Sequence, residues 1–343
     1  MTPPQSVLVT GASGYIAKHI VLQLLNAGFV VTGSLRKPER AAEVRAAVLP
    51  HLADASNIDA RLRFVVLDLN RDDGWAAAME GIDSLIHTAS PFPLIQPKNA
   101  QDLIRPAVEG ALRALRTARA AGIKRVVMTS SSVAVMVGNH LDRPADERDW
   151  SDLSAPDASA YVKSKTLAER AAWDFVANTA PEMALTVINP VLVLGPPLDR
   201  HFGTSVSIIE RVLRAKDPAV PRIGFPIVDV RDVATMHLRA LQQPETAGKR
   251  YIAVDRFMWF EDIAKTLAAT YPDRKIVTRV APTLLLRVMA LFDPAIRSIL
   301  PMLGKREEVS NARARRELGI AFTPAPDSVR ETAQVLIKQQ APG

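Results

Sequence analysis

The chain has 343 residues, of which 23% are charged and 48% hydrophobic, and its formal net charge is +7. This length predicts one large domain with an attached lobe, or two domains, and the composition excludes a disordered protein. Lysine and arginine are dispersed and only 5% of the residues are aromatic, so we expect no nucleic-acid partner, although the charge is compatible with an anionic cofactor.

The chain contains no cysteine, which excludes disulfides, thiol catalysis and thiolate metal sites. Its first residues carry neither the basic nor the apolar region of a secretory signal, so we expect a cytoplasmic protein with no membrane partner. The apolar segment 283–303 is too interrupted by charges and prolines to span a bilayer, and it predicts one or two packed helices, with an interfacial membrane helix as the alternative. Its apolar stripe consists of Leu284, Val288, Leu291 and Phe292.

The stretch from Ser6 to Ile20 predicts a strand, a tight turn and the start of a helix. Gly11 and Gly14 remove side chains where the backbone must bend and where an anion approaches it. Amides of the first helical turn then point at a phosphate, assisted by the helix dipole. An ordinary β-turn-α corner is the alternative, because the G-x-x-G-x-x-A pattern is weak on its own. The residues expected to bind the phosphates are Gly11, Gly14, Tyr15, Ile16 and Ala17.

Strands and helices alternate after this unit, which is typical of a doubly wound parallel sheet with covered faces, the Rossmann fold. The first half predicts strands at 28–34, 62–67, 83–87, 125–129 and 184–189 and helices at 38–49, 72–80, 99–121 and 158–179. The second half predicts strands at 227–230 and 250–254 and helices at 231–241, 261–271, 309–318 and 328–338. We expect residues 1–189, rejoined by about 226–255, to form the dinucleotide-binding domain, and residues 190–225 and 256–343 to form a smaller α/β substrate lobe.

The residues after the second strand indicate which dinucleotide binds. An acidic residue here favours NAD, because it holds the ribose hydroxyls, whereas arginine favours the 2′-phosphate of NADP. Arg36 and Lys37 occupy this place, with Arg40 further on and no acidic residue beside the two cations. The sequence therefore favours NADPH/NADP+ over NAD, unless both cations are merely solvated loop charges.

Residues after the third and fourth strands are the next expected cofactor contacts. Asp68, followed by Leu69, is placed to accept a hydrogen bond from the adenine, with a helix cap or Asx-turn as the alternative. Thr88, Ala89 and Ser90 are small enough for the chain to pass close to the cofactor. His87 is expected to be a packing residue at the end of a strand. The other histidines show no metal-ligand spacing, so we predict no metal.

Tyr161 and Lys165 lie four residues apart at the start of a helix, and so share one face. An ammonium beside a phenol favours the phenolate and lowers the tyrosine pKa, which makes Tyr161 a proton donor to a carbonyl oxygen. A hydroxyl to polarise that carbonyl is available in 129–132, directly after the fifth strand, where the register is ambiguous. The candidates are Thr129, Ser130, Ser131 and Ser132.

Together these motifs resemble the extended short-chain dehydrogenases/reductases, within the NAD(P)-dependent epimerase/dehydratase superfamily. The resemblance spans nearly the whole chain, and its motifs are specific for fold and reaction type rather than substrate. It is closest to the branch of dihydroflavonol, cinnamoyl-CoA and yeast-type methylglyoxal reductases. The motifs that carry it lie at 9–17, 107–110, 125–131, 161–165, 189–196 and 228–234.

The resemblance implies a role for individual residues. Ser131 matches the catalytic serine, Tyr161 the acid/base, and Lys165 its partner, which also holds the nicotinamide ribose. The implied reaction is NADPH-dependent reduction of an aldehyde or ketone to an alcohol by hydride transfer, with Tyr161 as proton donor. Segments that wall the nicotinamide match at Pro190, Leu192 and Ser205.

Two departures from the branch bear on the substrate. Residues 132–137 are apolar where flavonoid enzymes carry an asparagine, and the cysteine-bearing motif of the cinnamoyl-CoA enzymes is missing. We therefore expect a small-molecule carbonyl substrate in a mainly apolar pocket that includes Phe92, Val133 and Phe202. The alternatives are an NAD-dependent nucleotide-sugar epimerase or dehydratase and a non-catalytic dinucleotide sensor. The protein is expected to be a monomer or a homodimer.

Overall fold

The structure is a computed structural model that describes residues 5–91, 99–139 and 141–340. A central sheet has seven strands in the order β3-β2-β1-β4-β5-β6-β9, and all its neighbouring pairs are parallel. The order reverses between β1 and β4, the position at which doubly wound sheets bind ligands. This topology confirms the predicted doubly wound fold. The strands are β1 (Ser6–Thr10), β2 (Val30–Leu35), β3 (Leu62–Val66), β4 (Ser84–His87), β5 (Arg125–Thr129), β6 (Ala184–Pro190) and β9 (Lys249–Ala253).

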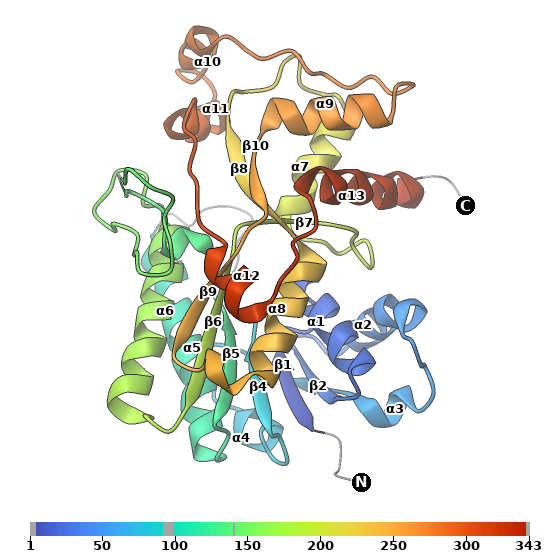
Figure 1. The fold of residues 1–343 in the computed structure, drawn as a ribbon, viewed down its shortest axis with the longest axis vertical. Helices are drawn as coiled ribbons and strands as arrows, with labels where there is room; N and C mark the ends of the chain where they lie inside the picture. Colours follow the sequence, from blue (N-terminus) through green and yellow to red (C-terminus); the bar gives the residue numbers. More distant parts are fainter. Residues whose placement is uncertain (1–4, 92–98, 140, 341–343) are drawn as a thin grey trace.

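Helices cover both faces of this sheet (Figure 1). Alternation along the strands supplies both hydrophobic cores: in β1, Val7 and Val9 pack on one face and Leu8 on the other. The first face carries α1 (Tyr15–Asn26), α2 (Arg40–Val48), α8 (Val230–Gln242) and α12 (Ala312–Leu318). The second carries α4 (Trp75–Ala78), α5 (Gln101–Ala120) and α6 (Ala160–Thr179). The short α3 (Ile58–Arg61) precedes β3.

A smaller sheet lies beyond the carboxyl ends of the large one, with strand order β10-β8-β7 (Figure 1). Its strands are β7 (Leu192–Leu194), β8 (Gly224–Asp229) and β10 (Arg256–Trp259), and its core includes residues of α7 (Thr204–Leu213), α9 (Phe260–Thr270) and α13 (Ala325–Gln340). Within 226–255, β8 belongs to this small sheet, whereas α8 packs on α1 and β9 completes the large sheet. The chain therefore passes between the two sheets more than once.

Two short helices, α10 (Thr283–Met289) and α11 (Pro294–Ile299), occupy the interrupted apolar segment. The predicted packed stripe is wrong: Leu284 is 75% exposed, Phe292 is 84% exposed, and Val288 and Leu291 are exposed as well. Helix α10 buries Leu286 instead, so its packed side is the opposite one. Across the described ranges, none of the helices combines the length and the apolarity needed to cross a membrane.

Candidate active site

A cavity of about 1010 Å³ lies along the carboxyl ends of the central strands and reaches the segment before α7. Most residues predicted from separate motifs meet on its wall, so the fold brings together positions up to 194 residues apart. These are Gly11, Gly14, Tyr15, Ile16, Ala17, Arg36, Lys37, Asp68, Leu69, Thr88, Ala89, Ser90, Ser131, Tyr161, Lys165, Pro190 and Ser205. Phe92 lies outside the described residues.

Three predicted residues do not line this cavity. Leu192 packs against the core of the small sheet, and its neighbours Val191 and Val193 line the cavity instead, because side chains alternate along β7. Phe202 is half-buried against the same small-sheet core. Val133 lies in a short 3-10 turn and packs against the core of the large sheet. The proposed roles of these three residues therefore remain predictions that the cavity lining does not support.

The first turn leaves the start of α1 open to an anion. Gly11 has φ +67°, and a Cβ there would lie 3.1 Å from the Ala89 Cα, so the turn favours glycine at this position. Gly14 is the N-cap of α1, where no side chain caps the helix and no acidic residue occupies the first turn. The amides at this helix end and the positive end of its dipole therefore fit the phosphates of a dinucleotide.

Two cations border the cavity near the end of β2. Arg36 and Lys37 are both exposed, and within the part of the chain that the structure describes neither side chain is paired with a carboxylate. Arg40 also lines the cavity, but its Nε and Nη2 atoms donate to the carboxylate of Glu43 at 2.9 and 2.5 Å. Arg36 and Lys37 are thus available to an anionic group such as a 2′-phosphate.

The sequence left open whether Asp68 forms an Asx-turn or faces the cofactor. In the structure it forms the turn and also lies at the cavity wall. Its Oδ1 atom accepts the Asn70 amide at 2.8 Å, which forms an Asx-turn, and its carbonyl accepts the Trp75 Nε1–H at 3.0 Å. Asp68 also lines the cavity. The carboxylate is therefore held in a fixed position at the cavity wall.

His87 positions backbone rather than serving as an acid or base. It is buried, and its Nδ1 atom lies 2.9 Å from the Thr10 hydroxyl, which also accepts the amides of Thr88 and Ala89 at 3.1 Å each. Burial, assisted by the positive charge of Lys165, lowers the pKa of His87 to about 4. The imidazole is therefore neutral at pH 7, and the cluster fixes the chain after β4 against the end of β1.

Tyr161 and Lys165 lie on the first turns of α6, which Ser159 caps by accepting the Val162 amide at 3.3 Å. The Lys165 Nζ atom is 6.0 Å from the centre of the Tyr161 ring. Burial lowers the pKa of Lys165 to about 8, and the charge of Glu169 opposes that effect. Burial also raises the pKa of Tyr161, although a hydrogen bond with Ser131 opposes this. The expected lowering of the Tyr161 pKa by lysine is therefore not found, because burial dominates, and the phenol remains protonated at neutral pH.

The hydrogen-bond partners of the hydroxyls at the end of β5 distinguish Ser131 from Thr129. Ser131 is the one that bonds to the Tyr161 phenol. The Thr129 hydroxyl is 2.7 Å from the His237 Nε2 atom, and His237 donates its Nδ1–H to the Val233 carbonyl at 2.8 Å, so the Thr129 hydroxyl is the donor and is occupied. Ser131 is therefore the hydroxyl placed beside the Tyr161 phenol.

Residues 7–253 match the NAD dependent epimerase/dehydratase family. The chain belongs to this family. It is 31% identical over 337 residues to cinnamoyl-CoA reductase CAD2 of Medicago truncatula, covering 96% of this chain and 95% of that protein. It is 34% identical over 292 residues to a putative NADPH-dependent methylglyoxal reductase, GRP2, of Candida albicans, covering 79% of this chain and 84% of the relative.

A solved structure agrees with these relatives. Yeast methylglyoxal/isovaleraldehyde reductase Gre2, complexed with NADPH, superposes with a TM-score of 0.80 at 27% identity, covering 98% of this chain and 99% of the other. The recognised branch of reductases is thereby confirmed. The likeness to Gre2 extends over 98% of this chain, so it includes both sheets.

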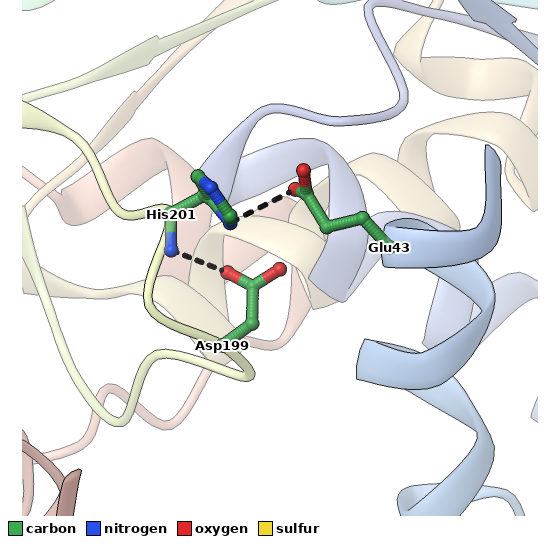
Figure 2. A group of neighbouring side chains, drawn as sticks. All are labelled: Glu43, Asp199 and His201. Atoms are coloured by element: carbon green, nitrogen blue, oxygen red, sulfur yellow. Dashed lines mark hydrogen bonds and ion pairs between the residues drawn. The ribbon is translucent and has the colours of Figure 1, made fainter. Parts of the chain in front are cut away.

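Figure 2 shows a cluster that resembles a metal site, in which Glu43, Asp199 and His201 place ligand atoms within 4.8 Å of one another. The Lys18 ammonium already provides a cation there. It donates to Glu43 Oε1 at 2.9 Å and also bonds to Asp199, and its side chain is 2% exposed. The cluster is therefore an ion-pair clamp that joins α1 and α2 to the segment before α7.

Sequence reasoning did not identify several residues of the cavity wall. Gly203 and Thr204 begin α7, a helix that it did not predict because prolines interrupt the pattern before it. Asp102 lies on α5, where its charge is typical of a solvated helix face. The other unpredicted lining residues are Ser13, Ser34, Leu67, Asn70, Trp75, Leu103, Pro106, Val191 and Val193.

Proposed function

We propose that this protein is an NADPH-dependent oxidoreductase that reduces an aldehyde or ketone to an alcohol. The observation that carries the proposal is that one cavity is lined both by Arg36 and Lys37, which have no carboxylate partner among the described residues, and by Ser131, Tyr161 and Lys165. Its relatives support the reaction class, because they are named as reductases and yeast Gre2 is complexed with NADPH.

Each residue of the reacting end has a chemical task in this proposal. When bound, NADPH supplies the hydride to the carbonyl carbon. The Ser131 hydroxyl donates a hydrogen bond to the carbonyl oxygen, and Tyr161 transfers its proton to that oxygen as it becomes an alkoxide. The buried Lys165 ammonium stabilises the phenolate that remains and holds the ribose hydroxyls. The raised pKa of Tyr161 suits this direction, because a donor must be protonated before the reaction.

The cofactor end fits NADPH through charge and backbone geometry. The open N-terminus of α1 faces the pyrophosphate, and Arg36 with Lys37 binds the 2′-phosphate. Pro190 and Ser205 wall the nicotinamide, together with Val191 and Val193 in place of Leu192. For the substrate we propose a small carbonyl compound rather than a flavonoid or a CoA thioester, because residues 132–137 offer no asparagine to bind phenolic hydroxyls.

The test is a panel of aldehydes and ketones followed by NADPH oxidation, with wild type and Tyr161→Phe. We expect turnover of at least one small carbonyl by the wild type, and a fall in kcat of about 100-fold or more in Tyr161→Phe, because the proton donor is lost. NADPH affinity, measured by fluorescence, should change less than about threefold, since the ring is retained.

Tyr271→Phe is the matched control, because Tyr271 lies at the end of α9 in the small-sheet lobe and does not line the cavity. It should retain full activity. Undiminished turnover in Tyr161→Phe would remove Tyr161 from the proposed role, and tighter binding of NADH than NADPH would contradict the cofactor assignment.

A further inference from the structure

A fully buried carboxylate lies directly beneath the reacting end of the cavity. Glu169 follows Lys165 by one turn of α6, on the same face, and its exposed fraction is 0%. Its Oε1 atom accepts the Arg250 Nε–H at 2.5 Å and the Trp173 Nε1–H at 3.3 Å. Its Oε2 atom accepts the Asn189 Nδ2–H at 2.7 Å. Both carboxylate oxygens are therefore engaged.

Asn189 connects this carboxylate to the backbone of Ser131. The side chain is fully buried at the end of β6, and its Nδ2 group also donates to the Ser131 carbonyl at 3.1 Å. Because one Nδ2 group donates to both Glu169 and Ser131, the orientation of the amide is fixed. A displacement of Glu169 is thus transmitted to the chain that carries the Ser131 hydroxyl.

Arg250 holds Glu169 from the other side. It comes from β9, its exposed fraction is 6%, and its Nη1 atom donates to the carbonyls of Asp149 at 2.8 Å and Glu147 at 3.3 Å. Its guanidinium also stacks over the Trp150 ring, 3.8 Å from the centre. A buried ion pair costs so much desolvation that it is weak in stabilising a fold, so this pair calls for an explanation besides stability.

We propose that Glu169, held by Arg250, is a positioning residue for the reaction: it fixes Asn189 against the Ser131 carbonyl and places a negative charge one helical turn from the Lys165 ammonium. This inference rests on the proposed function, since it requires Ser131 and Lys165 to act on a carbonyl substrate. Glu169 and Arg250 carry opposite charges, so we expect them to affect the pKa of Lys165 in opposite senses.

The other charged groups near Lys165 have little influence on its protonation, so Glu169 and Arg250 are the charges that determine it. His87 on β4 is neutral at assay pH, since its pKa is about 4. Asp102 on α5 borders the cavity at an exposed position, where solvent screens its charge. The Glu147 carboxylate accepts the Ile252 amide and lies 3.8 Å from Arg313. Arg170, also on α6, is exposed and stacks over Trp150.

The sign of the effect follows from these charges. Glu169 raises the pKa of Lys165 against the lowering by burial. Glu169→Gln keeps an amide oxygen for its neighbours but removes the negative charge, so deprotonation of the Lys165–Tyr161 pair moves to lower pH. Arg250→Met removes the positive charge and moves the same deprotonation to higher pH. Reduction requires the protonated pair, so the fall in kcat/KM at high pH, the alkaline limb of the profile, follows the deprotonation of this pair.

The experiment records kcat/KM against pH, from 6 to 10, for the wild type, Glu169→Gln, Arg250→Met and the control Trp173→Phe. We expect the alkaline limb to move down by about one pH unit in Glu169→Gln and up in Arg250→Met. It should not move in Trp173→Phe, which loses an N–H donor but no charge. Asn189→Ala should lower kcat about tenfold without moving the limb, because it releases Ser131 and leaves both charges in place.

A merely structural role predicts lower thermal stability in both charge variants with unmoved limbs, and that result would overturn the inference. NADPH affinity against pH gives a second reading that does not need turnover, because a neutral Lys165 attracts the anionic cofactor less. If the wild type reduces none of the carbonyls, the proposed function fails, while the binding profiles of the two charge variants still decide the role of Glu169. A shift of the alkaline limb in the same direction in Glu169→Gln and Arg250→Met would also contradict the inference.

Discussion

Arg36 differs from most arginines of this protein in having a cavity in front of it and, in the described part of the chain, no carboxylate partner. A charge-assisted hydrogen bond to a phosphate is worth about 1.5–3 kcal/mol. We therefore expect Arg36→Ser to weaken NADPH binding about 10- to 100-fold and NADH binding less than about threefold.

Fluorescence titration with both cofactors checks this. Arg116→Ser is the control, because Arg116 is exposed on α5 and does not line the cavity. An equal loss of affinity for NADPH and NADH would show that Arg36 does not bind the 2′-phosphate.

Asp232 on α8 gives the fold a pH dependence. Its carboxyl accepts the Thr323 amide at 2.7 Å and lies 3.2 Å from the Thr323 hydroxyl, yet burial raises its pKa to about 6. This folded-state value lies above the unfolded value of about 3.9, so the contribution to stability is complete below about pH 4 and is lost as pH rises through 6. Asp232→Asn, which cannot ionise, should be more stable than the wild type by on the order of 1 kcal/mol at pH 8.

Urea unfolding at pH 4, 6 and 8 measures the difference. The two proteins should converge as the pH falls, because the wild-type carboxyl becomes neutral as well. A stability difference that is constant from pH 4 to 8 would contradict the assignment.

At the residue scale, the sequence predicted those site residues that lie close to one another along the chain. Tyr161 and Lys165 are one helical turn apart, so their proximity follows from the helix alone. The choice of Ser131 among neighbouring hydroxyls needed the phenol to be in place. Arg250 on β9 pairs with Glu169 on α6 from 81 residues away, and no local pattern indicates such a partner.

Among the elements, the Lys18 clamp joins three segments that have little else in common. Lys18 on α1 bonds to Glu43 on α2 and to Asp199 before α7, with 2% of its side chain exposed. Removing a buried cation leaves two carboxylates together, so Lys18→Met should lower the free energy of unfolding by about 3 kcal/mol or more. It should also weaken NADPH binding, because the segment that Asp199 anchors continues into Gly203 and Ser205 on the cavity wall.

Urea unfolding and NADPH titration test the clamp. The control is Arg71→Ala, which breaks an ion pair with Asp73 whose side chains are 72% and 75% exposed, and which should change stability by less than about 1 kcal/mol. Similar effects of the two substitutions would show that the clamp contributes no more than a surface pair.

The longest helices were predicted closely, whereas several short elements were missed. Helices α5 and α6 show enough periodic positions for the pattern to emerge, and the strand predicted at 125–129 matches β5. Strands β7 and β10 contain three and four residues, too few for an alternation to be recognised. Pairing with β8 makes them strands, and that partner is distant in sequence.

At the scale of the whole molecule, α10 and the turn that follows it, residues 283–292, present an apolar surface. Leu284 is 75% exposed and Phe292 is 84% exposed, whereas Leu286 between them is 7% exposed. Leu284→Ser and Phe292→Ser should therefore leave the free energy of unfolding within about 0.5 kcal/mol of wild type. Leu286→Ala should lower it by about 2 kcal/mol or more, because it leaves a cavity.

Thermal and urea unfolding of the purified variants at several protein concentrations check this contrast. Values that do not depend on protein concentration are expected where both side chains face solvent. A large loss of stability in Leu284→Ser would show that this residue is covered in solution.

The strand order has a consequence for the chain as it is synthesised. When residue 190 has been added, six of the seven strands of the large sheet are present, but the edge of β6 has no neighbour until β9 is complete at residue 253. Roughly sixty residues, which include β7, α7, β8 and α8, must emerge while that edge remains open to pairing with other chains. The same delay leaves Glu169 without Arg250, so the newly made protein acquires its last sheet strand and its buried ion pair in one step.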